Sequence, residues 1–140
     1  MRPHKIRRLL FATAILTMVG CAVQGPSYQQ AEPSPTKANV YVYRTYPTLA
    51  FGWAVQLPIN CGDYSIELGP GGYHMFKVDP GKIMCSAHSE NTSNVQFDTQ
   101  PGHDYYVRAW VSIGVLLPEY HLDLVDASEA QGQLQTCKMQ

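Results

Sequence analysis

The chain has 140 residues, and its 10 basic and 11 acidic residues give a formal net charge of −1. Four of the basic residues lie in the first eight positions, so the sequence after residue 20 carries six basic and 11 acidic residues, a net charge of −5. This length fits one small domain. The scattered Lys and Arg side chains argue against nucleic acids as partners, and the negative charge balance argues against anionic lipid headgroups.

The first 20 residues have the order of a secretory signal. Basic residues between Arg2 and Arg8 precede an apolar run from Leu9 to Val19. This run is shorter than the roughly 20 residues of a membrane-spanning helix, which argues against an uncleaved span. An ordinary cleaved leader, with the next cysteine incidental, would favour a small residue where Met18 stands. We therefore expect residues 1–20 to be a lipoprotein signal peptide.

The four residues around the expected cleavage point carry the first resemblance. They read Met18-Val19-Gly20-Cys21 and resemble the lipobox of bacterial lipoproteins, with Met18 where Leu is usual. The resemblance implies that Cys21 is lipidated and becomes the new N-terminus, and that at least two acyl chains hold it stably in the membrane. In that class Ala22, rather than Asp, indicates the outer membrane, on its periplasmic face.

A polar stretch separates this cysteine from the first strand-like segment. Residues 22–39 are rich in Pro, Gln, Ser and Ala, which is typical of a flexible tether. About 18 such residues would hold a domain roughly 20 to 25 Å from the lipid surface. We therefore expect a lipidated cysteine and tether over residues 21–39 and a folded domain over residues 40–140.

From residue 40 onward the hydrophobic period is two, with turn residues at intervals of about 8 to 12. Strands are expected at residues 40–44, 53–59, 64–68, 73–78, 82–88, 95–98, 103–112 and 120–125. The apolar run 113–118 is not assigned by this pattern. The spacing predicts an all-β domain, either a small antiparallel β-sandwich of about seven to eight strands or a small barrel, and we favour the sandwich.

The end of the chain has helical spacing. Asp126 stands at an N-cap position with Glu129 three residues later, as in a capping box. Cys137 falls on the apolar face of this short C-terminal helix. With Cys61 and Cys85 it leaves an odd number of thiols after lipidation, so one disulfide is expected. The sequence does not determine the pairing, and Cys61 with Cys85 is one candidate.

The order of motifs after the tether carries a second resemblance. The motifs are Val40-Tyr41-Val42-Tyr43-Arg44, Gly71-Gly72-Tyr73, Val78-Asp79-Pro80-Gly81, Pro101-Gly102 with Tyr105-Tyr106-Val107-Arg108, Leu124-Val125-Asp126 and Cys137-Lys138. Together they resemble an uncharacterised family of bacterial lipoproteins, a domain of unknown function. That resemblance implies a β-sandwich similar to transthyretin-like and carbohydrate-binding-like modules, and it assigns no catalytic residues.

Aromatic residues offer the main candidate binding face. Tyr106, Arg108 and Trp110 alternate on one face of the longest expected strand, so they could stack on sugar rings or meet a protein. The opposite face, with Tyr105, Val107, Ala109 and Val111, is the expected core face. Tyr41 and Tyr43 alternate in the same way on the first strand. The competing interpretation is that a helix or a second sheet covers these rings.

Metal and hydrolase chemistry have weaker signals. His121 and Asp123 share a strand face, and His74, Met75, Met84, Cys85 and His88 suggest copper, but alternation places these five on different faces. Ser86 or Ser112 with His103 would be needed for a hydrolase, and no nucleophile-elbow glycines flank either serine.

The expected function follows from the anchor and the aromatic face. We expect no cofactor, no metal site and no enzymatic activity. The hypothesis is a lipid-anchored accessory lipoprotein that binds an envelope protein or glycan, with a metal-handling lipoprotein and a small envelope hydrolase as alternatives.

Overall fold

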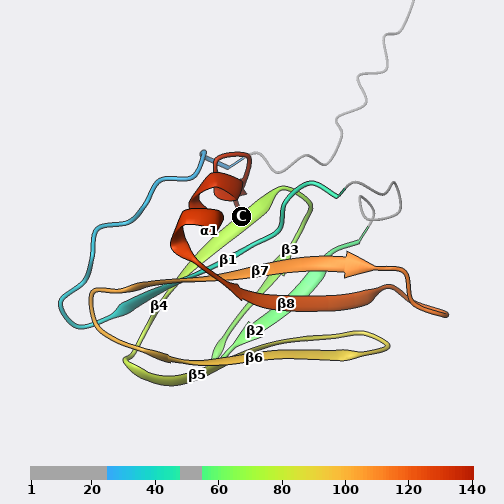
Figure 1. Ribbon diagram of the computed structural model, residues 1–140, viewed down its shortest axis with the longest axis horizontal. Coiled ribbons are helices and arrows are strands. Elements are labelled where there is room, and N and C mark those ends of the chain that lie inside the picture. Colours follow the sequence, from blue (N-terminus) through green and yellow to red (C-terminus); the bar gives the residue numbers. More distant parts are fainter. Residues whose placement is uncertain (1–24, 48–54) are drawn as a thin grey trace, which may run out of the picture.

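Two β-sheets pack face to face in the computed structural model, which describes residues 25–47 and 55–140 (Figure 1). The five-stranded sheet, sheet A, has the order β8 (Glu119–Val125), β7 (Asp104–Ser112), β1 (Ala38–Tyr43), β4 (Gly72–Val78) and β9 (Lys138–Met139). The four-stranded sheet, sheet B, has the order β3 (Tyr64–Leu68), β2 (Leu57–Cys61), β5 (Gly81–His88) and β6 (Thr92–Thr99). One helix, α1 (Ala127–Leu134), lies near the C-terminus.

The predicted fold class, a mostly β two-sheet domain with a short C-terminal helix, is confirmed. Sheet A is mixed rather than antiparallel throughout, because β1 pairs with β7 and β4 pairs with β9 in parallel. A parallel pair needs a long crossover connection, and here the strands of sheet B lie between β1 and β7 along the chain. Which strands pair, and in which direction, depends on contacts between distant parts of the chain, so the alternation did not predict the parallel pairs.

The main core lies between the two sheets. The inward positions of β7, Val107 and Ala109, are fully buried there, as the alternation predicts. Arg44, at the end of β1, is also buried and donates from Nη1 to the carbonyl oxygen of Val55 at 2.6 Å. The disulfide between Cys61 and Cys85 joins directly opposed residues of β2 and β5 inside this core.

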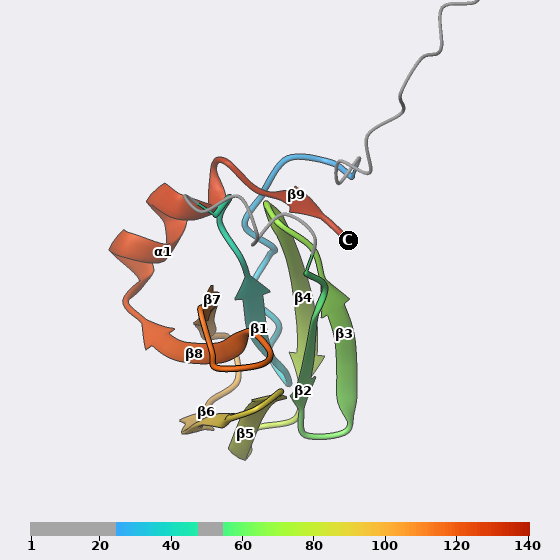
Figure 2. The ribbon, with the colours of Figure 1, turned by 90° about the vertical axis from the view of Figure 1, so that its right-hand side faces the viewer.

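A second hydrophobic cluster covers the outer face of sheet A. It contains Tyr28, Tyr41, Tyr43, Tyr73 and Tyr106 with Ala130, Leu134 and Cys137, and we call it the tyrosine cluster. Figure 2 shows α1 and sheet B on opposite sides of β1 and β7. Because both faces of β1 are covered, all six of its residues are buried.

The segment 25–37 differs from the expected tether. Tyr28 is buried, and its ring makes edge-on contacts with the rings of Tyr41 and Tyr73. The Met139 N–H donates to the Pro26 carbonyl oxygen at 2.9 Å. The described part of the tether therefore packs along the domain, because burial of the Tyr28 ring and backbone pairing hold it there.

Several expected elements differ in detail. The strand expected at 95–98 extends over Thr92–Thr99, and the two-residue strand β9 was not predicted. The strand expected at 53–59 begins at Leu57, and residues 53 and 54 lie outside the described chain. Asp126 is the N-cap residue of α1 but makes no side-chain cap hydrogen bond, and Glu129 pairs instead with Arg108.

Candidate functional site

The five residues of the predicted aromatic face do not form one exposed surface. Tyr41, Tyr43 and Tyr106 belong to the buried tyrosine cluster, with 2% or less of each residue exposed. Trp110, with 41% exposed, and the partly exposed Arg108 remain accessible. The expectation of an exposed tyrosine face is therefore corrected: the helix and segment 25–37 cover these rings.

Hydrogen bonds show that the buried phenols of Tyr41 and Tyr43 have structural partners. The Tyr41 hydroxyl accepts from the Ala31 N–H at 2.8 Å, and the Tyr43 hydroxyl donates to Oε1 of Gln133 at 2.6 Å. Burial raises the pKa of Tyr41 and of Tyr43 to about 12, so both phenols are neutral at physiological pH.

The accessible side chains of β7 and β8 form a second arrangement, which we call the exposed β7–β8 face. Its members are the cross-strand pairs Arg108–Asp123, Trp110–His121 and Ser112–Glu119. The Trp110 and His121 rings stack with centroids 3.9 Å apart and planes 14° apart. Alternate positions of two antiparallel neighbours bring these six side chains to one face.

Trp110 is held in place by polar contacts as well as by stacking. Its indole Nε1 donates to Oδ2 of Asp123 at 2.9 Å, and Arg108 donates to the same carboxylate oxygen at 3.1 Å. Arg108 also donates to Oε1 of Glu129 on α1 at 2.6 Å. The indole is therefore exposed but has a fixed orientation.

Ser112 and His121 lie within hydrogen-bond distance of each other, a pair that the sequence did not predict. The Ser112 Oγ is 2.8 Å from Nε2 of His121, and Glu119 lies on the same ring nitrogen at 3.8 Å. A serine–histidine–acid relay needs the acid on the other ring nitrogen. The arrangement is therefore a surface hydrogen-bond chain. The expected partner of Ser112, His103, makes its contact with the Pro101 carbonyl oxygen.

The residues considered for metal binding are used in other contacts. Asp123 is committed to Trp110 and Arg108, and Cys85 is in the disulfide. His74 contacts the Gln140 carbonyl oxygen, and His88 contacts Thr92. Within residues 25–47 and 55–140, no three His, Cys, Asp or Glu side chains are grouped so as to hold a metal ion.

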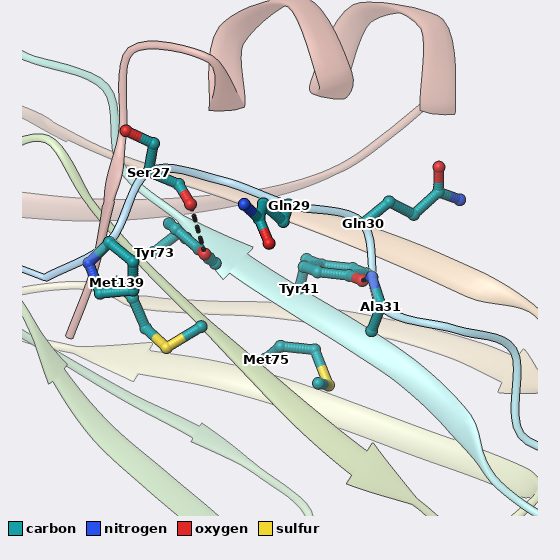
Figure 3. A pocket seen from close by; sticks show the side chains of 9 residues that line it. Ser27, Gln29, Gln30, Ala31, Tyr41, Tyr73, Met75 and Met139 are labelled. Carbon is teal, nitrogen blue, oxygen red and sulfur yellow. Dashed lines mark hydrogen bonds between the residues drawn. The ribbon is translucent and has the colours of Figure 1, made fainter.

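A shallow pocket of about 230 Å³ lies between segment 25–37 and the outer face of sheet A. Figure 3 shows the thioethers of Met75 and Met139 at its rim and the rings of Tyr41 and Tyr73 below the chain segment. The Tyr73 hydroxyl donates to the Ser27 carbonyl oxygen at 3.5 Å. This volume is below the roughly 300 to 1,000 Å³ of typical ligand pockets, so the exposed β7–β8 face is the better candidate site.

Comparison with known proteins adds no family. No protein-family model matches the chain, and no curated protein matches it. In the described part of the chain, no helix has the length and apolar character to cross a bilayer. The class that the structure defines is a two-sheet β-rich domain with an exposed aromatic and charged face on one hairpin.

Proposed function

We propose that the chain is a non-enzymatic accessory protein of the bacterial envelope, anchored through lipidated Cys21 to the outer membrane on its periplasmic face. The basic and apolar leader, the lipobox-like motif and the resemblance to uncharacterised lipoproteins support the anchor. The disulfide between Cys61 and Cys85 agrees with export, because disulfides persist in oxidising compartments.

The binding role of the proposal rests on one observation, the exposed Trp110 stacked on His121. A ring that is already fixed loses little conformational entropy on binding, and aromatic residues are enriched where proteins contact their partners. The charged pairs around it supply polar contacts at the rim. The partner we propose is an envelope protein or glycan.

The anchor is tested by the mass and location of the protein made in a bacterial host. The proposal expects a product that lacks residues 1–20, carries acyl chains on Cys21 and fractionates with the outer membrane. Cys21→Ser should abolish acylation and membrane retention. An unprocessed, unacylated chain in the cytosol would overturn the proposal.

The binding face is tested by photo-crosslinking in intact cells. A photo-reactive phenylalanine at position 110 should give a specific adduct, and the same group at the exposed Gln96 of β6 serves as the matched control. Trp110→Ala should abolish recovery of that partner while the fold is retained. Identical adducts from both positions, or none from position 110, would remove the binding role.

A further inference from the structure

The loop between β7 and β8 exposes a group of large apolar side chains. Ile113, Val115, Leu116 and Leu117 are 72%, 91%, 88% and 56% exposed, and we call them the apolar tip. Single exposed apolar residues are common, but four within five positions form a patch of the kind that marks an interaction site.

Side chains of the turn between β5 and β6 hold the backbone of the apolar tip in place. The Glu90 carboxylate accepts hydrogen bonds from the N–H of Val115 at 2.9 Å and of Leu116 at 2.7 Å. The Ser89 hydroxyl donates to the Pro118 carbonyl oxygen at 2.6 Å. A Cβ on Gly114 would overlap the Leu117 carbonyl oxygen and the Glu90 carboxylate. The loop is therefore built to present its apolar side chains outward.

Strand register and strand order place the apolar tip beyond the level of sheet A at which the described N-terminal segment begins, and on the opposite edge of the sheet. Tyr43 lies opposite both Arg108 and Tyr73, and Tyr73 lies opposite Met139. Ser27 bridges to Lys138, so it lies at the same level of the sheet. From Arg108, β7 continues for four residues toward the tip, which is about 14 Å of strand. Figure 1 shows the loop between β7 and β8 extending past the rest of the sheet.

Because segment 25–37 packs on the domain, the chain between Cys21 and the domain is shorter than the tether predicted from the sequence. Because Gly25 and Pro26 lie against the backbone of Met139, only four peptide steps separate the packed segment from Cys21. These steps span at most about 14 Å. A lipid on Cys21 would therefore hold the start of the segment within about 14 Å of the membrane. This is about the distance by which the apolar tip projects beyond that start along the strands, so the tip can reach the lipid surface, where its effective concentration is high.

We propose that the apolar tip inserts into the interfacial region of the lipid bilayer, as a second membrane contact beside the lipid of Cys21. This inference rests on the proposed anchor. The tip carries no Lys or Arg, and the nearest charged residues, Glu90 and Glu119, are acidic, so it suits zwitterionic rather than anionic lipid.

The experiment uses the full processed protein reconstituted into phosphatidylethanolamine–phosphatidylcholine vesicles that contain acyl-chain-brominated lipid. A bimane probe is attached at Leu116→Cys or, as the matched control, at Gln100→Cys, an exposed position at the opposite end of the sheet. We expect several-fold stronger quenching at position 116 than at position 100. In the labelled Leu116→Cys protein, Val115→Ser with Leu117→Ser should reduce that difference without changing the melting temperature.

Three results would overturn the proposal. Equal quenching at the two positions would show that the tip stays out of the lipid. A spectral shift at position 116 that grows with protein concentration without vesicles would assign the tip to a second copy. A photo-crosslinker at position 116 that gives a protein adduct and no lipid adduct in cells would assign it to a protein partner.

Failure of the anchor is distinguished from failure of the tip by the mass of Cys21. If the mass shows no acylation, the same labelled protein is added to preformed vesicles at increasing lipid concentration. Quenching at position 116 alone would then support the tip without the anchor, and no quenching would overturn it.

Discussion

Trp110 and Tyr106 lie four residues apart on one face of β7, yet their environments differ. Trp110 is 41% exposed, whereas Tyr106 is buried in the tyrosine cluster. Trp110→Ala should lower the free energy of unfolding by about 1 kcal/mol or less, because little apolar area leaves a packed site. Tyr106→Ala should lower it by about 3 to 5 kcal/mol. Urea denaturation of both variants measures the difference, and equal losses would contradict this assignment.

The sequence could predict which face of β7 each of these two residues lies on, but not whether another element covers it. Alternation correctly separated Val107 and Ala109 from the opposite face of β7. It could not show that α1 crosses Tyr106 and stops short of Trp110, because that depends on where a later element packs. The first strand held a signal that was missed: Val40 to Tyr43 has no polar residue, which is typical of a strand buried on both faces.

Helix α1 contains an internal glycine that the fold does not require. A Cβ on Gly132 would meet no atom within 4 Å, and its backbone has no positive φ. Gly132→Ala should therefore stabilise the protein by about 1 kcal/mol, because Ala restricts the unfolded chain and favours helix. Thermal unfolding measures this gain. Gly71→Ala is the contrasting control and should destabilise, because Gly71 has φ of 69° and lies against the Tyr46 ring.

Elements with strong local signals were predicted well, and those held by distant contacts were not. The C-terminal helix and most strands follow from period and turn residues. Strand β9 has two residues and exists because Lys138 and Met139 pair with the start of β4. Segment 25–37 lacks any periodic pattern, so only its contacts with the tyrosine cluster distinguish it from a free tether.

The disulfide links β2 to β5 across 24 residues of chain and contributes to the stability of the whole domain. Cys61→Ala with Cys85→Ala should lower the free energy of unfolding by about 3 kcal/mol, mainly because the unfolded chain becomes less restricted. Urea denaturation with and without reductant measures it. Reductant should destabilise the wild-type protein and leave the double variant unchanged.

Alkaline pH should destabilise the molecule through the tyrosine cluster. The pKa of Tyr41 and of Tyr43 is about 12 in the folded protein, against about 10 in an unfolded chain. Above pH 10 the unfolded chain therefore releases protons that the folded protein retains, and stability falls as pH rises toward 12. Denaturation between pH 8 and 12 should show this slope. Tyr41→Phe should flatten it, because one of the two raised pKa values is then removed.

The buried position of Cys137 bears on the order in which the sulfur chemistry can proceed. Cys137 follows both bonded cysteines in the chain, so the Cys61–Cys85 bond has the opportunity to form before the third thiol has emerged. In the folded protein the Sγ of Cys137 lies 3.7 Å from the Arg44 carbonyl oxygen, and burial raises the pKa of this thiol. Thiolate attack by Cys137 on the Cys61–Cys85 bond is thereby suppressed, so the docked segment protects the native pairing from exchange.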